Sequence, residues 1–345
     1  METIEYLIVG GGPAGLRAGQ VLAEARCEVL VVEKHAEIGP KTCAGGLTPK
    51  TVTLLRQLGL PEHAGLASVG QVAFAAGRPV TLDPARTMVV TLPRRDLGRY
   101  QAAWTRSAGA EVRSGCTVRE LDLVRRTAVV GNTRVAWRHL IGADGSDSAV
   151  RRALGLPSPR ICFAAEYNLK GVRLDPLRVE CDRALGGGYF WVFPHQDYTS
   201  VGAVAPKHVV RPARLRAYLD ARLETLRVSR QGEVLEGATL EVDFPGLHFA
   251  GGVHLAGDAA GVPSSLTAEG IYSALLTGEE VARGILDPSY RSVPFRRWLR
   301  VKRRHDRLAA FLRRPSARAA VLPALERLSR WSPARRPLAD WFLAG

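Results

Sequence analysis

The 345-residue sequence has few cysteines and no long uninterrupted apolar run. Its five cysteines are scattered, without the paired spacing that ligates zinc or iron–sulfur clusters. We therefore expect no metal site, and free thiols of this kind suit a reducing cytoplasm. No apolar stretch is long enough to span a bilayer, and no signal peptide precedes the first predicted strand. These absences predict a cytoplasmic protein without a transmembrane segment.

Acidic residues are scarce near the C-terminus. Between Arg291 and Arg336 the chain has fifteen Lys or Arg and two acidic residues, so the rest carries only about +2 of the net charge of +15. A helix here can lie on an anionic membrane surface or pack its apolar face on the protein body. No nucleic-acid-binding motif accompanies the charge, so we expect no nucleic acid partner. The apolar residues that fall mostly on one helical face are Phe295, Trp298, Leu299, Phe311 and Leu312.

A glycine turn near the N-terminus is the strongest motif. The apolar stretch from Tyr6 to Val9 runs into the turn at residues 10–15 and then into a helical pattern. Glu33 follows eighteen residues after the last glycine, at the end of a second apolar strand. Strand, turn, helix, strand and acid in this order predict a dinucleotide-binding unit. Its expected cofactor-binding residues are Gly10, Gly12, Pro13, Ala14, Gly15, Glu33 and Lys34.

The spacing has a chemical reason. Gly10 permits the tight turn, Gly12 lets the backbone approach a pyrophosphate, and Gly15 lets the helix lie close to the sheet. The N-terminus of the helix offers free N–H groups and a positive dipole to the phosphates. Glu33 would accept hydrogen bonds from ribose hydroxyls and repel a 2′-phosphate. The unit is therefore expected to bind FAD or NAD rather than NADP.

Two later blocks distinguish between these cofactors. The strand His139–Gly142 ends in Ala143, Asp144 and Gly145, and the strand Val253–Leu255 is followed by Gly257 and Asp258. Together with the glycine turn, they resemble the fingerprint of the FAD-dependent fold of para-hydroxybenzoate-hydroxylase-like monooxygenases. The sequence has no second strand–glycine–helix fingerprint, because residues 186–188 precede a strand. A two-Rossmann reductase is therefore disfavoured, and a nicotinamide donor would bind only transiently.

The resemblance implies roles for individual residues. Asp144 would brace the cofactor, and Asp258 would bond its ribityl chain. The backbone of Gly270 and Ile271, at the start of a helix, would face the flavin O2 and stabilise the anion of reduced flavin. Arg94 would reach the cofactor, with Arg95 as the alternative. The cofactor-binding residues implied by the resemblance, beyond the glycine turn, are Cys43, Ala44, Gly46, Arg94, Val118, Asp144, Asp258, Gly270 and Ile271.

Two further segments resemble the geranylgeranyl reductase family. The first is Cys43-Ala44-Gly45-Gly46, which in that family runs over the isoalloxazine ring. The second is the aromatic strand from Tyr189 to Pro194. The resemblance covers residues 4 to 285 and implies reduction of C=C bonds in an isoprenoid chain by hydride transfer from reduced FAD. Candidate catalytic residues are Cys43, Tyr189 and Trp191, with Cys43 and Tyr189 as possible proton donors beside water.

Tyr189, Trp191 and Phe193 alternate, so they share one face of the predicted strand. The segment 200–204 is expected to return as its hairpin partner. Such an aromatic wall suits a long apolar substrate and would stabilise a developing carbocation, although rings in this pattern also fill cores. Three histidines, His195, His248 and His254, have no partner pattern, and we interpret them as structural.

The sequence therefore predicts an α/β fold with three parts. A discontinuous Rossmann-like FAD-binding domain of the glutathione-reductase and hydroxylase type occupies residues 1–69, 92–154 and 249–287. An inserted antiparallel β-sheet substrate domain occupies 70–91 and 155–248. A basic C-terminal helical arm occupies 288–345.

The predicted function is saturation of a prenyl lipid, prenyl diphosphate or prenylquinone. Electrons would come from an external donor such as NAD(P)H or ferredoxin. A monooxygenase or halogenase of a small aromatic compound shares the three FAD blocks and is the alternative. An electron-transfer flavoprotein without an organic product is a third hypothesis. Each of these functions requires FAD. The predicted location is the cytoplasm, and the basic arm would allow contact with a membrane surface.

Overall fold

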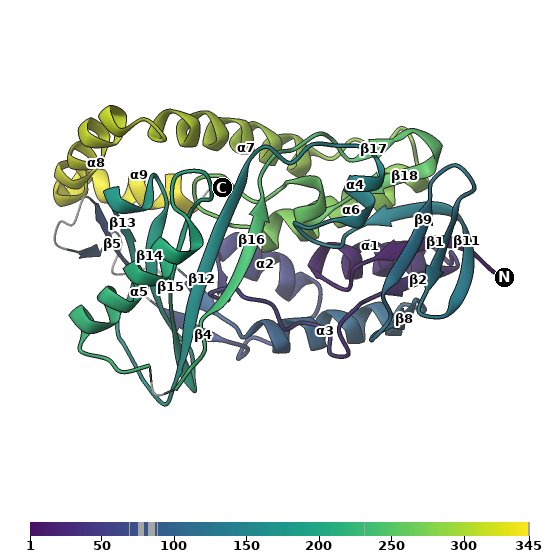
Figure 1. Cartoon of the computed structure of the whole chain (residues 1–345), viewed down its shortest axis with the longest axis horizontal. Helices are drawn as coiled ribbons and strands as arrows, with labels where there is room; N and C mark the ends of the chain where they lie inside the picture. The colour runs from purple at the N-terminus through teal and green to yellow at the C-terminus, as the bar shows by residue number, and fades with distance from the viewer. Residues whose placement is uncertain (69, 75–78, 82–86, 88, 231, 344–345) are drawn as a thin grey trace.

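The structure is a computed structural model that describes all residues except 69, 75–78, 82–86, 88, 231 and 344–345. Two sheets lie at opposite ends of an elongated molecule, and a long helix, α7 (Val293–Leu312), spans them along one edge (Figure 1). We call the eight-stranded sheet, with helices α1 (Pro13–Glu24), α3 (Arg94–Ser107) and α6 (Ile271–Leu286), the cofactor half. The seven-stranded sheet, with α5 (Pro212–Leu226), is called the substrate half.

The cofactor half is built around β1 (Glu2–Val9), which pairs in parallel with β2 (Val29–Val32) and β11 (Thr133–Gly142). Strand β2 is a continuous apolar run and β1 is apolar from Tyr6 to Val9, as expected for parallel strands that are buried on both faces. Helix α1 (Pro13–Glu24) packs against α6 (Ile271–Leu286). The other elements of this half are β8 (Glu111–Arg113), β9 (Val118–Asp122), β10 (Thr127–Val130), β17 (His248–Phe249), β18 (Val253–Leu255), α3 (Arg94–Ser107), α4 (Ala149–Ala153) and the 3-10 turns Ala250–Gly252 and Gly257–Ala260.

The substrate half is a sheet in the order β16-β12-β15-β14-β13-β5-β6. The predicted hairpin is confirmed, because β14 (Tyr189–Pro194) pairs antiparallel with β15 (Tyr198–Pro206). One pair departs from the expected antiparallel sheet: β5 (Gly70–Phe74) runs parallel to β13 (Leu177–Cys181). The other elements are β6 (Val80–Thr81), β12 (Ile161–Lys170), β16 (Glu236–Glu241), α5 (Pro212–Leu226) and the 3-10 turn Arg183–Leu185.

A small sheet between the halves joins segments that the sequence assigned to different domains. β7 (Val89–Thr91), expected in the substrate half, pairs with β3 (Gly46–Leu47) and β4 (Leu66–Ser68). The adjoining helix is α2 (Pro49–Gln57). Part of the predicted 70–91 insertion lies outside the described residues. The domain boundaries at residues 69 and 92 therefore stay a prediction.

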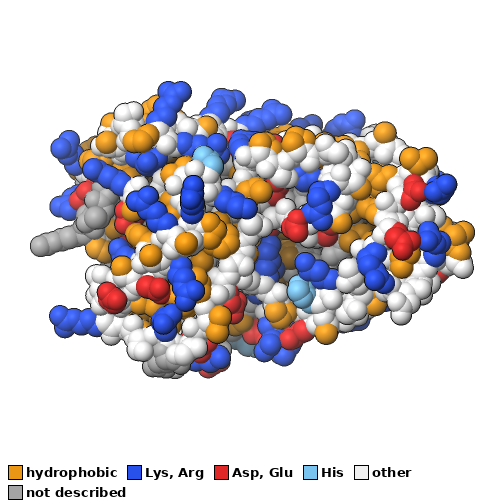
Figure 2. Space-filling model, in the orientation of Figure 1, with side chains coloured by type: hydrophobic (Ala, Val, Ile, Leu, Met, Phe, Trp, Pro, Cys, Tyr) orange, Lys and Arg blue, Asp and Glu red, His pale blue; other side chains and the backbone are white. Residues whose placement is uncertain are grey.

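The C-terminal segment forms three helices that pack on the body: α7 (Val293–Leu312), α8 (Pro315–Arg330) and α9 (Ser332–Leu343). On α7, Trp298 is buried, and its neighbours Phe295 and Leu299 pack with it against the core of the cofactor half. The apolar face of α7 is thus largely covered by the protein. Lys and Arg side chains line the outer edge over α7 (Figure 2). No helix among the described residues is long and apolar enough to cross a membrane.

Candidate cofactor and substrate site

The glycine turn leaves no room for side chains except at one position. A Cβ on Gly10, whose φ is +111°, would stand 2.2 Å from the carbonyl oxygen of Ala143. A Cβ on Gly15 would stand 2.0 Å from the carbonyl oxygen of Gly10. Gly12 instead faces open space, and as the N-cap of α1 it provides no side-chain cap. The first-turn N–H groups are therefore accessible to an anionic group, as a pyrophosphate requires.

Glu33 is held in place beside this turn. Its carboxylate accepts hydrogen bonds from the backbone N–H of Gly11 at 2.8 Å and of His35 at 3.0 Å. Lys34 is exposed next to it, and Val118 begins β9 two residues after Cys116, whose N–H bonds the Glu33 carbonyl. The structure thus brings the residues predicted to contact the adenosine together at one edge of the cofactor half.

The two aspartates of the later blocks have different partners. Asp144 accepts hydrogen bonds from the Ser148 hydroxyl and the Ala149 N–H, both at 2.6 Å, at the start of α4, and burial raises its pKa. Asp258 makes an ion pair with Lys41 Nζ at 2.6 Å. Asp258 and Gly270 both line the cavity described below. Lys41 was not predicted, because 217 residues separate it from Asp258.

Arg94 and Arg95 are distinguished by their surroundings. Arg95 is exposed and makes an ion pair with Glu37 at 2.8 Å. Arg94 lines the cavity, and its Nε is buried without a hydrogen-bond partner among the described residues. A buried guanidinium nitrogen without a partner is costly unless a ligand supplies an acceptor. Together with the open face of Gly12, this fits a bound FAD.

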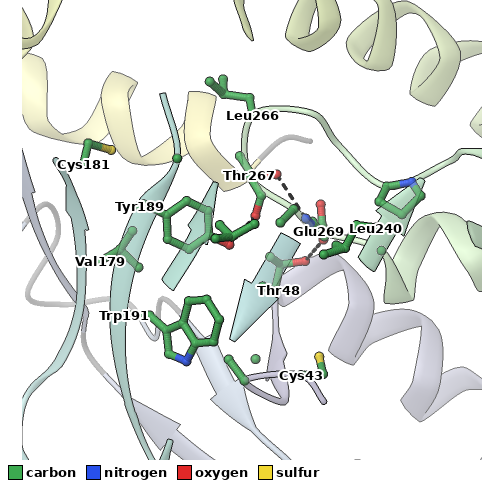
Figure 3. Close-up of a pocket in the computed structure, with 18 of the residues that line it drawn as sticks. Cys43, Thr48, Val179, Cys181, Tyr189, Trp191, Leu240, Leu266, Thr267 and Glu269 are labelled. Atoms are coloured by element: carbon green, nitrogen blue, oxygen red, sulfur yellow. Dashed lines mark hydrogen bonds between the residues drawn. The ribbon is translucent and has the colours of Figure 1, made fainter. Parts of the chain in front are cut away.

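A cavity of about 580 Å³ lies where the two halves meet. Cys43, Gly46 and Ile271 line its cofactor side, and the aromatic strand β14 lines the opposite side. Figure 3 shows Tyr189 and Trp191 projecting from this strand into the space that Cys43 also borders. The cavity therefore brings the predicted flavin-facing residues and the predicted substrate wall together.

The aromatic side chains divide as the alternation predicts. Tyr189, Trp191 and Phe193 line the cavity, whereas Phe190 and Val192 pack in the core beneath α5. The Tyr189 hydroxyl donates to the Thr267 carbonyl at 2.7 Å, and burial raises its pKa above the usual range. The indole N–H of Trp191 donates to Ser200 Oγ at 2.9 Å. The Tyr189 hydroxyl and the Trp191 N–H are thus both hydrogen-bonded within the protein, and the faces of the two rings remain available to an apolar ligand.

Two residues that were not predicted to act there make hydrogen bonds to the backbone of the segment Cys43–Gly46. Glu166 accepts the backbone N–H of Cys43 at 2.7 Å, and the His195 Nε2–H donates to the Ala44 carbonyl at 3.0 Å. Burial lowers the pKa of His195 to about 4, so it is neutral near pH 7. The sequence contains no local sign of either contact, because more than a hundred residues separate the partners.

The loop before α6 is tied to α2. Thr48 Oγ1 donates to a carboxylate oxygen of Glu269 at 2.6 Å (Figure 3). Lys50 forms an ion pair with the same carboxylate at 2.8 Å. These contacts fix the approach to Gly270 and the N-terminus of α6, which points its uncapped N–H groups toward the cavity.

The far end of the cavity is closed by the C-terminal helices. Leu312 ends α7, Leu322 and Leu325 project from α8, and Leu338 lies on α9. Leu322 and Leu338 pack on Phe74 of β5. We expected this segment to be an outer arm, and its role as a cavity wall was missed. The many arginines of this segment dominate its sequence pattern, so the apolar positions that face the cavity were not recognised.

Comparisons with known proteins agree with this geometry. A family model for the FAD binding domain matches residues 3–232. Digeranylgeranylglycerophospholipid reductase 1 of Methanopyrus kandleri is 30% identical, covering 88% of this chain and 85% of that protein. Geranylgeranyl diphosphate reductase of Rhodobacter capsulatus is 30% identical, covering 82% of this chain and 75% of that protein.

A solved structure shares the whole fold. The geranylgeranyl bacteriochlorophyll reductase-like protein of Thermoplasma acidophilum aligns with a TM-score of 0.78 at 22% identity. The alignment covers 99% of this chain and 96% of that protein. This chain belongs to the FAD-binding-domain flavoproteins and, within them, to the geranylgeranyl reductase family.

Proposed function

We propose that this protein is an FAD-dependent reductase that saturates C=C bonds in an isoprenoid chain. The observation that carries the proposal is the cavity, whose walls are mostly aliphatic and aromatic and which runs from the flavin-facing segment at Cys43 to the leucines of α8 and α9. A long apolar chain fills such a space, whereas a small polar aromatic substrate does not require it.

When bound and reduced by an external donor, FAD would supply a hydride to one alkene carbon, and a proton from Cys43, Tyr189 or water would reach the other carbon. The protein's own groups bind, orient and exclude water. The glycine turn and the N-terminus of α1 would hold the phosphates, and Arg94 and Asp258 would hold the remainder of the cofactor. The N-terminus of α6, at Gly270, stabilises negative charge that develops beside it. Tyr189, Trp191 and Phe193 shield the alkene from water and stabilise positive charge on carbon by cation–π attraction.

Of the two predicted proton donors, Cys43 is the better placed. The Tyr189 hydroxyl is already hydrogen-bonded to a backbone carbonyl, and burial raises its pKa. Cys43 lines the cavity on the cofactor side. Replacing Cys43 with Ser should therefore lower the reduction rate more than Tyr189→Phe does. A larger loss in Tyr189→Phe, with FAD content unchanged, would reverse the assignment.

The direct test is anaerobic turnover of the dithionite-reduced holoenzyme with geranylgeranyl diphosphate, a digeranylgeranyl glycerophospholipid or a menaquinone. We expect a mass gain of one H₂ for each reduced bond. Unchanged recovery of all three would contradict the proposal. The alternative, oxygenation of a small aromatic compound, predicts NAD(P)H oxidation with oxygen uptake that phenols stimulate and isoprenoids do not.

We also propose that the protein works in the cytoplasm at an anionic membrane surface and takes electrons from a separate donor. Because the apolar face of α7 is largely covered, the surface that supports this is the end of α8. There Trp331 is 62% exposed and Leu328 is 39% exposed, beside the exposed Arg327 and Arg330. Exposed aromatic and basic side chains together favour the headgroup region of anionic membranes. Replacing Trp331 and both arginines should abolish flotation with anionic vesicles.

A further inference from the structure

A buried carboxyl group stands one layer behind the cavity. Glu166 lies on β12 with 1% of its surface exposed and is not one of the cavity-lining residues. One carboxylate oxygen accepts the Cys43 N–H at 2.7 Å, and the other accepts the Ser200 hydroxyl at 2.6 Å. Ser200 in turn accepts the indole N–H of Trp191 at 2.9 Å. One side chain thus connects the flavin-facing segment to the aromatic wall.

We propose that Glu166 is a positioning residue: it sets the place of the Cys43 backbone and, through Ser200, of the Trp191 ring. The effect of the Cys43 backbone and the Trp191 ring on the substrate rests on the proposed function, whereas their positioning by Glu166 does not. Hydrogen bonds to an ionised acceptor are about twice as strong as neutral ones, so a carboxylate here holds both groups firmly. A change in the distance between the Cys43 segment and the Trp191 ring would misplace the alkene relative to the cofactor.

The protonation state of Glu166 changes this network. Burial is the largest influence and raises the pKa of Glu166 to about 7, and the Ser200 and Cys43 hydrogen bonds oppose that rise. If Glu166 gains a proton, its O–H must donate to Ser200 Oγ, and the Ser200 proton then loses its partner. The ionised form therefore keeps the network complete. The groups that face Glu166 are Cys43 from the loop, Arg94 from α3, Tyr198 and Ser200 from β15, and Glu236 from β16.

The chain offers a matched set of variants. Glu166→Gln keeps the shape and can still accept the Cys43 N–H while donating to Ser200, but it cannot titrate. Glu166→Ala removes both contacts. Glu236→Gln is the control, because Glu236 is the cross-strand partner of Glu166 on β16 and is exposed.

The first experiment measures amide hydrogen exchange of the peptide that contains Cys43, in the apoprotein and the holoprotein. We expect Glu166→Ala to speed exchange at Cys43 by about tenfold or more, Glu166→Gln to restore most of the protection, and Glu236→Gln to match the wild type. Unchanged exchange in Glu166→Ala would overturn the proposal, and so would exchange in Glu236→Gln as fast as in Glu166→Ala. This readout needs no isoprenoid, so it stands even if the proposed function fails.

The second experiment measures reduction of the isoprenoid substrate against pH. In the wild type, kcat should rise with pH through about 7, whereas the KM should change little. Glu236→Gln should keep this rise but move it to lower pH, because the charge of Glu236 helps to raise the pKa of Glu166. In Glu166→Gln this inflection should disappear. An inflection that persists unchanged in Glu166→Gln would refute a positioning role for this carboxyl, and this result remains decisive if Glu166→Ala does not fold.

Discussion

The two halves of the molecule hold their ligands in different ways. In the cofactor half, backbone geometry within one short segment forms the proposed FAD-binding surface, as at Gly10, Gly12 and Gly15. In the substrate half and the C-terminal helices, the cavity is formed by side chains from segments far apart in the chain, such as Trp191 and Leu322. A single added methyl group in the glycine turn should therefore lower FAD affinity strongly. On the substrate side, affinity for the isoprenoid should depend on the size of the individual side chains that line the cavity.

The largest effect is expected in the glycine turn. In Gly15→Ala the new methyl group would overlap the Gly10 carbonyl, so the turn must move and FAD affinity should fall by more than about 100-fold. Gly12→Ala has open space in the protein and should leave the thermal stability of the apoprotein unchanged while still weakening FAD. Flavin titration and thermal denaturation separate the two. If Gly12→Ala bound FAD with wild-type affinity, the phosphates of FAD would not lie close to the Gly12 backbone.

A large effect restricted to substrate is expected at Val179, which projects into the cavity from β13 (Figure 3). Val179→Phe should lower affinity for an isoprenoid by about tenfold or more while FAD content stays at the wild-type level. Val124→Phe adds the same bulk at a 93% exposed position and should change neither quantity. Loss of FAD in Val179→Phe would show that the two halves do not bind independently.

A moderate effect should separate the two neighbouring arginines. Arg94→Gln removes a buried guanidinium whose Nε has no protein partner, and it should weaken FAD by about tenfold, as loss of a charged hydrogen bond does. Arg95→Gln breaks only an exposed ion pair, which is worth about 0–1 kcal/mol. It should change FAD affinity less than about twofold. An equal loss of FAD affinity in the two variants would contradict the different roles assigned to Arg94 and Arg95.

The smallest effect expected is a pH dependence of opposite sign in the two halves. Burial lowers the pKa of His254, which contacts His139 and His248, to about 3, so its contribution to stability is present above pH 6.5 and is lost as pH falls toward 3. The raised pKa of Glu166 has the opposite consequence: its contribution is present below pH 4.5 and is lost as pH rises through about 7.

Thermal denaturation of variants tests both signs. His254→Gln should reduce the loss of stability in acid. Glu166→Gln should raise the melting temperature at pH 8, where the wild type buries a charge, although it alters the pH profile of turnover. A melting temperature at pH 8 that falls in Glu166→Gln would show that the ionised carboxyl stabilises the fold.

The elements that local patterns specify were predicted well. The β1–turn–α1 unit, the β14–β15 hairpin and the start of α6 all lie where the sequence indicates. Each depends on glycine spacing, alternation or apolar runs within about twenty residues, which act before distant segments meet. The parallel β5–β13 pair and the place of β7 depend instead on which distant strands meet, and no local pattern encodes that.

The sequence by itself determined the dinucleotide turn, the aromatic face of β14 and the presence of a basic C-terminal segment. Tertiary structure alone decided that this segment closes the cavity and that Asp258 pairs with Lys41. It also decided that Glu166 connects Cys43 to the aromatic wall. The physical reason is that a turn is recognised by the backbone conformations its own residues allow. An ion pair between distant residues, or a buried carboxyl group, forms its interactions only once folding brings its partners together.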